Sequence, residues 1–232
     1  MSAGLDTFQG VFEQGIPVLR TRLNQAFKDF VNRGGYKVVW EEFEDRIFEV
    51  VERFLLERIP NLRRGDISQT KTKSAYPDFK ICYQGKTYAI DIKSGADDKL
   101  ILGTTWGDLT PSRKITPTNI ELSTTSHITV KYSRTGGKEG EIQVKDIYIE
   151  PFYKSVGIRL ECNGVLYRPY DGKLRPKIWK DFESGKAYWP TLADFMEGLK
   201  RSRSHRRMSL IRDWIMDMSP KEKAHLQKLL GG

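Results

Sequence analysis

The chain has 232 residues, a formal net charge of +9 and a sequence pI of about 9.4, and its length is typical of one domain. A content of 38% hydrophobic and 11% aromatic residues argues against disorder, and the basic excess favours nucleic acid first and an anionic membrane surface second as a partner. Only Cys82 and Cys162 occur, without a Cys-x-x-Cys pair, and the three histidines are scattered, which excludes a zinc ribbon and a disulfide framework.

Two helices are predicted in the N-terminal region. Apolar residues recur at helical spacing from Ile16 to Val31, and Gly34-Gly35 ends this helix. A stronger apolar period runs from about Glu41 to Arg58, and Pro60 stops it. The polar, basic segment from Arg63 to Ser74 is then expected to form a loop.

A β-hairpin is predicted over residues 76–93, YPDFKICYQGKTYAIDIK. Asp78 opens the strand DFKICY, a Gln84-Gly85-Lys86 turn follows, and the second strand TYAIDIK alternates in period two. The alternation sorts residues onto two faces, Tyr88, Ile90 and Ile92 on one and Ala89, Asp91 and Lys93 on the other. Such a hairpin can bring Asp78 close to Asp91 across the sheet.

Two carboxylates and a lysine on one strand face form a candidate catalytic set. Neighbouring carboxylate oxygens suit Mg²⁺, and Lys93, two residues after Asp91, could polarise an attacking water or hold a phosphate. A surface ion pair of little energetic value is the alternative, because Pro-Asp followed by Asp-x-Lys arises by chance in many chains. Pro77 and the apolar Ile90 and Ile92 favour the catalytic interpretation, since they would present the charged face on a rigid element.

Further strands are predicted after an irregular segment, rich in Gly, Thr and Pro, from Ser94 to Glu121. The expected strands are His127–Ser133, Ile142–Phe152, Gly157–Glu161 and Val165–Arg168. Asn163-Gly164 is a strong two-residue hairpin signal between the last two.

The C-terminal part is predicted to be helical. Thr191 can cap a helix from Leu192 to Lys200, a second helix spans roughly Arg206 to Met218, and Ser219–Glu222 is a capping box that opens a third. Helices, then a mostly antiparallel sheet, then helices indicate an α+β or mixed α/β fold.

No targeting or membrane segment is evident in the sequence. The N-terminal MSAGLDTF lacks the charged and apolar regions of a signal peptide, and no run approaches the ~20 apolar residues of a membrane span. A reduced, cytoplasmic setting is therefore expected.

The hairpin carries the sequence pattern of the PD-(D/E)xK nuclease superfamily. YPDF at Tyr76–Phe79 and AIDIK at Ala89–Lys93 resemble the corresponding segments of the EcoRV-like type II restriction endonucleases. Weaker similarities occur in the same order, namely IFE at Ile47–Glu49, KDF at Lys180–Phe182, GK at Gly185–Lys186, and the basic stretch leading into Arg212, Asp213 and Trp214. The resemblance implies a restriction-endonuclease-like core, a mixed, mostly antiparallel sheet flanked by helices.

The resemblance also implies roles for the acidic residues and the lysine. Asp78 and Asp91 would be the metal ligands and Lys93 the catalytic lysine. Glu49 would match the family's additional acidic residue and could recruit a second Mg²⁺ ion; a solvated helix face with ion pairs four residues apart is the alternative.

The implied activity is Mg²⁺-dependent hydrolysis of double-stranded DNA at a short palindromic site, leaving blunt ends with 5′-phosphates. The family implies a homodimer, whose two-fold symmetry would match the palindrome, and a cognate DNA methyltransferase in the host is expected. A structure-directed nuclease, such as a junction resolvase or repair nickase, is one alternative. A non-catalytic DNA-binding protein with a structural acidic hairpin is another.

Residues 1–232 are expected to form a single nuclease domain. Within it, residues 1–60 are a helical region that could supply the dimer surface, and residues 61–170 hold the catalytic sheet. Residues 171–232 would contain the DNA-recognition loop and the C-terminal helices.

Two loops are candidates for DNA contact by their position in the resemblance. Lys71, Thr72, Lys73 and Ser74 could reach phosphates or base edges, with a plain solvated loop as the alternative. The segment Tyr170–Lys177 occupies the place of the family's major-groove loop, but it carries Lys173 and Arg175 where the family has a loop rich in Gly, Asn and Thr. Arginine bidentate to guanine is the commonest specific contact in that groove.

The densest cationic run in the chain is KRSRSHRR, Lys200–Arg207. Phosphate contacts from Arg203, Arg206 and Arg207 would position DNA without reading its sequence, with a solvated interhelix turn as the alternative. Trp106, Trp179 and Trp189 are expected to pack rather than to stack on bases.

Overall fold

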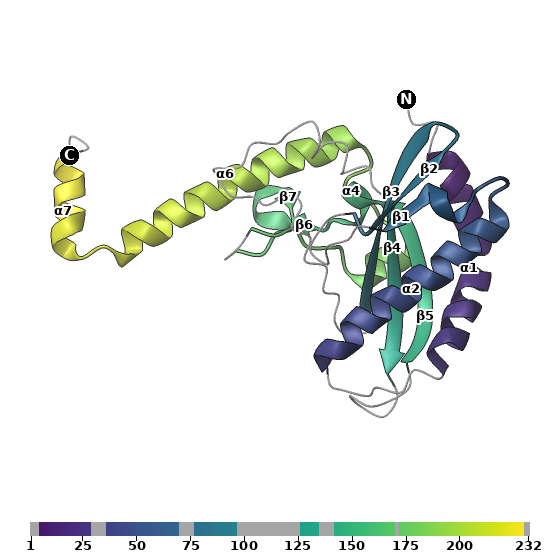
Figure 1. Cartoon of the computed structure of the whole chain (residues 1–232). Helices are drawn as coiled ribbons and strands as arrows, with labels where there is room; N and C mark the ends of the chain where they lie inside the picture. Colours follow the sequence, from purple (N-terminus) through teal and green to yellow (C-terminus); the bar gives the residue numbers. More distant parts are fainter. Residues whose placement is uncertain are drawn as a thin grey trace.

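The computed structural model describes residues 5–28, 36–69, 77–96, 126–134, 142–169 and 172–229. In this part of the chain a five-stranded sheet is flanked by helices, which confirms the predicted mixed α/β architecture (Figure 1). No helix within these ranges is both long and apolar enough to cross a membrane.

The sheet has the strand order β1-β2-β3-β4-β5. Its strands are β1 (Ile67–Gln69), β2 (Phe79–Tyr83), β3 (Lys86–Ala96), β4 (Ser126–Arg134) and β5 (Ile142–Pro151). β3 and β4 run parallel and the other three neighbouring pairs run antiparallel, so the prediction of a mixed, mostly antiparallel sheet is confirmed.

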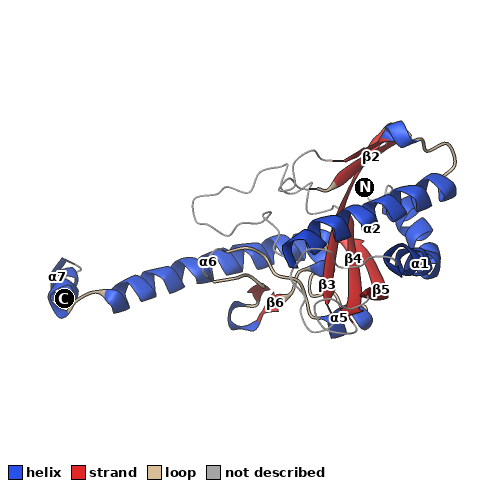
Figure 2. Ribbon diagram, turned by 60° about the horizontal axis from the view of Figure 1, so that its bottom comes forward, coloured by secondary structure: helices blue, strands red, loops and turns tan. Residues whose placement is uncertain are grey.

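One face of the sheet is covered by α1 (Leu5–Lys28) and α2 (Tyr36–Arg58) (Figure 2). The alternate residues Ile90 and Ile92 of β3 are 1% exposed in the core shared with these helices. An edge-on contact between Phe48 of α2 and Phe79 of β2, with ring centroids 5.1 Å apart, closes the layer over the hairpin. Burial of apolar side chains on this face supplies the main driving force for folding.

α1 begins at Leu5, whereas the sequence period predicts a helix only from Ile16. Glycine and proline lower helix propensity, and this helix contains Gly15 and Pro17. Packing explains why the helix persists, since a side chain at Gly15 would overlap the Phe54 ring and Phe12 stacks on the same ring at 6.0 Å. Tertiary contacts therefore outweigh a weak local preference here.

The edge strand β5 is clamped by α1. Asn24 accepts a hydrogen bond from the Val144 N–H at 2.8 Å and donates one to the Val144 carbonyl at 3.2 Å. One side chain thus satisfies both backbone groups at an edge that would otherwise offer them to another strand.

A second, smaller core follows β5. Its elements are α4 (Phe152–Ser155), β6 (Ile158–Arg159), the 3₁₀ turn η3 (Leu160–Cys162), β7 (Gly164–Val165) and the first half of α6 (Leu192–Asp217). Phe152, Trp189 and Phe195 meet edge to face in this core. α5 (Trp179–Glu183) instead packs against Tyr148 of β5. Trp179 and Trp189 are 8% and 3% exposed, as expected of packing residues.

Three element predictions near the sheet are corrected. Residues 67–69, expected in a loop, pair with β2 as β1, which η1 (Arg64–Asp66) precedes. β3 begins at Lys86, which is expected in the turn but pairs with Tyr83, and it continues to Ala96 because its pairing with β4 extends that far. The hairpin at Asn163-Gly164 exists, but Gly164 is paired in β7 and Asn163, with φ +47°, ends a four-residue connection from Leu160.

The prediction of two helices separated near Lys200–Arg207 is wrong, because α6 is continuous over 26 residues. The polar residues at the expected break have partners in the second core. Ser202 Oγ donates to the Val165 carbonyl at 2.9 Å and Arg201 Nε to the Asn163 carbonyl at 2.6 Å. The predicted caps are present, Thr191 bonding with Asp194 at the start of α6 and Ser219 with Glu222 at the start of α7 (Pro220–Leu229).

Candidate active site

Asp78 and Asp91 meet across the hairpin, as predicted. β2 and β3 pair Phe79 with Ile90, so the same register continued by one residue sets Asp78 opposite Asp91. Asp78 Oδ2 accepts a hydrogen bond of 2.6 Å from the Ile92 N–H, which fixes its carboxylate at the start of β2. The two carboxyl groups are close enough for the charge of Asp91 to raise the pKa of Asp78.

Lys93 completes the set on the same face of the sheet. Its Nζ lies 2.6 Å from Asp91 Oδ2 and 3.8 Å from Asp78 Oδ2, and it donates to the Ile92 carbonyl at 3.0 Å. The side chains are 1%, 17% and 33% exposed for Asp91, Lys93 and Asp78 respectively. Asp91 therefore forms the floor of the site and Asp78 its solvent side.

The pair of carboxylates is held at an electrostatic cost. Burial, followed by the charge of Asp91, raises the pKa of Asp78 to about 6, against the opposing effects of Lys93 and the Ile92 N–H. Burial likewise raises the pKa of Asp91, and Lys93 opposes that increase. A divalent cation between the carboxylates would relieve this repulsion.

Strand β4 adds His127, which in the sequence is only one of three scattered histidines. Parallel pairing sets His127 beside Asp91, with Nε2 3.4 Å from Asp91 Oδ2. Burial and the charge of Lys93 lower the pKa of His127 well below its usual value, so the imidazole is neutral. The alternation of residues predicts the strand β4 itself. Its parallel pairing with β3 is a long-range contact, which no local sequence pattern encodes.

The polar row continues to the edge of the sheet. His127 is paired with Glu150 of β5, and Glu150 Oε2 lies 2.8 Å from Nζ of the fully buried Lys177. Lys177 also donates to the Lys186 carbonyl at 2.8 Å. Burial raises the pKa of Glu150, and Lys177 opposes this increase. The segment that follows Arg175 is thereby attached to the polar face of the sheet.

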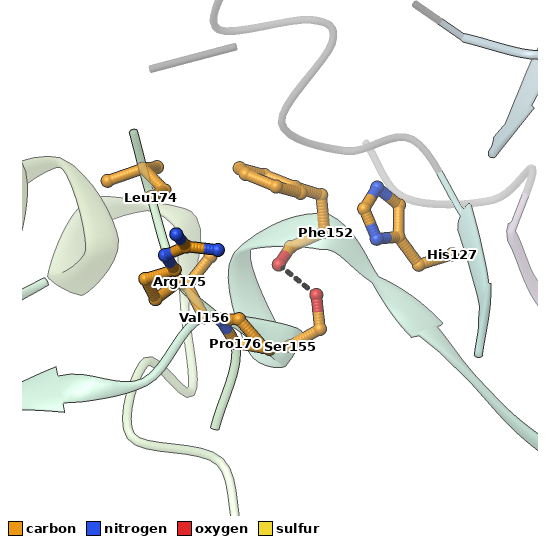
Figure 3. Close-up of a pocket in the computed structure, with 7 residues that line it drawn as sticks. All are labelled: His127, Phe152, Ser155, Val156, Leu174, Arg175 and Pro176. Atoms are coloured by element: carbon orange, nitrogen blue, oxygen red, sulfur yellow. Dashed lines mark hydrogen bonds between the residues drawn. The ribbon is translucent and has the colours of Figure 1, made fainter. Parts of the chain in front are cut away.

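A small cavity of about 10 Å³ separates this row from the second core. His127, Phe152 and Arg175 are among the residues that line it (Figure 3). The cavity is about large enough for a single water molecule.

The charges of the cluster provide one further observation. In the described part of the chain, Asp78 and Asp91 share a single cationic partner, Lys93 Nζ, at 3.8 and 2.6 Å. The imidazole of His127 beside them is neutral. With both carboxylates ionised the cluster has a net negative charge, which a divalent cation would offset. The described residues contain no group of three or more His, Cys, Asp or Glu side chains able to hold a metal. The residues present therefore fit a Mg²⁺ ion held by two carboxylates, with waters and substrate oxygens as its remaining ligands.

Glu49 lies apart from this pair. It is on α2, 61% exposed, and its carboxylate is 3.8 Å from Arg46 three residues earlier. The structure thus shows a solvated helix face with an ion pair at this position, and the role of Glu49 as a metal ligand stays a prediction.

The candidate DNA-contact residues have different environments. Lys71, Thr72, Lys73 and Ser74 lie outside the described residues, as do Tyr170, Asp171 and Trp106. Lys173 and Arg175 are half-buried in the segment that pairs with residues 156–168.

On α6 the cationic run is part of the helix, so the interhelix-turn alternative is wrong. Arg207 is exposed and Arg203 half-buried. Arg206 is 6% exposed and its Nε donates to the Pro169 carbonyl at 3.3 Å. Its side chain therefore holds the backbone at Pro169. For all of these residues, contact with DNA stays a prediction.

Comparison with solved structures finds similarity in fold at low sequence identity. No protein-family model matches the chain, and no curated protein does. Among solved structures, the chain is similar to one described as the NlaIV restriction endonuclease, with 13% sequence identity and a TM-score of 0.42. The alignment covers 67% of this chain and 61% of that one. A likeness at this level assigns no activity, so the chemistry has to come from the side chains described above.

Proposed function

We propose that this chain is a metal-dependent deoxyribonuclease that hydrolyses phosphodiesters in double-stranded DNA. The observation that carries the proposal is the set of Asp78, Asp91 and Lys93 on one face of a hairpin, with Lys93 Nζ 2.6 Å from Asp91. The net charge of +9 supports a polyanionic substrate.

Asp78 and Asp91 would hold Mg²⁺, and Lys93 would act on the substrate beside it. When bound, Mg²⁺ supplies a Lewis acid for the phosphate and lowers the pKa of a bound water. Asp91, fixed on the floor of the site, orients Lys93 through their ion pair. The ammonium can then donate to the scissile phosphate or to the attacking water. The main chain at Ile92 keeps Asp78 in place at the solvent side, where a duplex can approach.

In its finer form the proposal is a type II restriction endonuclease. A homodimer would cut a short palindrome to blunt ends with 5′-phosphates, and a host methyltransferase would protect that site. Support comes from the quoted sequence similarities to the EcoRV-like enzymes and from cationic side chains on α6, of which Arg207 is exposed.

The test is digestion of a sequenced phage DNA with Mg²⁺, followed by sequencing of the fragment ends. Discrete blunt ends at one palindrome support the full proposal. Cleavage of branched DNA without discrete fragments from linear duplex indicates the structure-directed nuclease instead. Binding to DNA without Mg²⁺-dependent cleavage, with Asp91→Asn binding equally well, indicates a non-catalytic DNA-binding protein.

A further inference from the structure

His127 is the one histidine on the polar face of the sheet among the described residues, and its position is fixed from several sides. The parallel register pairs it with Asp91 on β3, and the antiparallel register pairs it with Glu150 on β5. The Phe152 ring packs against the imidazole with centroids 4.9 Å apart. The side chain is 1% exposed, so the imidazole has little freedom to turn away.

The nitrogen that faces the acidic pair is Nε2. It lies 3.4 Å from Asp91 Oδ2, which is long for an N–H···O bond. Hydrogen bonds of this kind at catalytic sites often shorten when the substrate complex forms. Lys93 approaches the same oxygen at 2.6 Å, so Asp91 Oδ2 is held between a lysine and a histidine.

We infer that His127 is a positioning residue, whose Nε2–H donates to Asp91 and fixes the carboxylate in the orientation that binds the metal. The inference rests on the proposed function, because it assigns Asp91 the role of a metal ligand. The geometry gives Asp91 two neighbours with different tasks. His127 is buried and neutral and sets the angle of the carboxylate, whereas Lys93 is closer to solvent and can turn toward substrate. Partners behind a metal ligand typically affect metal affinity 10–100-fold.

The experiment measures Mn²⁺ binding to the full chain without DNA, by calorimetry, in three variants of His127. His127→Gln places an amide donor near the Nε2 position, His127→Asn places it near the Nδ1 position, and His127→Leu removes it. We expect His127→Gln to bind nearly as well as the unmodified protein. The Asn and Leu variants should bind about 10–100-fold more weakly.

His205→Leu is the matched control. His205 also has a polar partner, with Nδ1 2.9 Å from the Tyr167 hydroxyl, but it lies on α6 and no contact joins it to the acidic pair in the described residues. Its loss should leave Mn²⁺ affinity unchanged. Urea denaturation identifies any variant that does not fold, and the contrast between Gln and Asn tests the inference even if His127→Leu is unfolded.

The outcomes separate this inference from the proposed function. If His127→Asn binds Mn²⁺ as tightly as the unmodified protein, the positioning role is overturned while the metal site stands. If Gln weakens binding as much as Asn, a donor at Nε2 is not what matters, and the inference again fails. If the unmodified protein and Asp91→Asn bind Mn²⁺ equally, both the metal site and the role of His127 are overturned.

Discussion

The two faces of β3 have opposite roles. On one face Ile90 and Ile92 are 1% exposed beneath α1 and α2. On the other, Asp91 and Lys93 join Asp78 in a cluster whose burial raises the pKa of both carboxyls. One face of this strand therefore stabilises the fold, whereas the carboxylates on the other face are buried at a cost in stability.

This difference teaches how the site is kept rigid. Strand residues alternate between faces, so every residue of the acidic set is adjacent in sequence to a buried apolar one. The backbone that positions Asp91 is anchored by its neighbours rather than by its own contacts. Substitutions on the two faces should accordingly separate activity from stability.

The largest expected effect is on the polar face, with Lys93→Met. Loss of the ammonium removes the donor to substrate, and we expect the cleavage rate on plasmid DNA at saturating Mg²⁺ to fall about 10²–10⁴-fold. Lys86→Met, at the exposed turn end of the same strand, is the control and should cut at the normal rate. Unchanged cleavage by Lys93→Met would remove this residue from the mechanism.

The apolar face should give the opposite result with Ile92→Ala. The cavity left beneath the helices is expected to lower the free energy of unfolding by about 2–5 kcal/mol, measured by urea denaturation. Cleavage per folded molecule should stay near normal at low temperature. Met208→Ala, at a side chain that is 64% exposed, should change stability by less than about 0.5 kcal/mol. An equal loss in both variants would contradict the comparison.

On the polar face, Asp78→Asn should stabilise the protein and abolish metal binding. The folded-state pKa of Asp78 is raised from 3.8 to about 6, so the folded chain binds this proton more tightly than the unfolded chain does. Stability from this group is therefore present below pH 4 and is lost as pH rises through about 6. Without metal at pH 8, Asp78→Asn should be about 1–2 kcal/mol more stable, allowing for partial exposure.

The difference between Asp78→Asn and the unmodified protein should vanish near pH 4, and thermal denaturation across this range measures it. Added Mg²⁺ should stabilise only the unmodified protein. Asp45→Asn, at an exposed position of α2, should show neither effect. A variant less stable than the unmodified protein at pH 8 would show that the acidic pair carries no such cost.

The smallest expected effect is at the rim of the apolar face, with Asn24→Ala. Loss of its two hydrogen bonds to Val144 should lower the free energy of unfolding by about 1 kcal/mol, measured by thermal denaturation. Gln25→Ala, at the exposed next position, should be neutral. If Asn24→Ala leaves the free energy of unfolding unchanged, water replaces the two hydrogen bonds to Val144 without loss of stability.

The part of the site that could be predicted is the part encoded locally. A tight turn fixes the register of a hairpin, and the hairpin signal with its period of two predicted that Asp78 and Asp91 lie close together. The exact register comes from a two-residue turn, Gln84-Gly85, because Lys86 pairs with Tyr83 instead of belonging to the predicted three-residue turn. His127 could not be predicted, because β4 lies beside β3 only through a parallel, long-range pairing. Glu150 joins the row through the antiparallel pairing of β4 with β5, and Lys177 reaches it through an ion pair between residues 27 positions apart in the sequence.

The fold shows the same division between local and distant causes. Alternation and capping residues predicted β4, β5 and the start of α7 closely. The predicted break in α6 failed because Ser202 and Arg201, polar in sequence, bond with the second core. α1 extends further than predicted because Gly15 makes room for Phe54. In each failure a contact from a distant segment outweighed the local pattern.

The continuous α6 affects how the size of this molecule is measured. At a rise of about 1.5 Å per residue, its 26 residues give a rod of about 39 Å, and its second half carries α7 away from the body (Figure 1). A compact chain of this length would have a radius of gyration of about 17 Å, and a projecting helix increases that value. Elution volume would then overstate the mass of a single chain. The proposed homodimer therefore has to be identified by a direct mass measurement, such as light scattering.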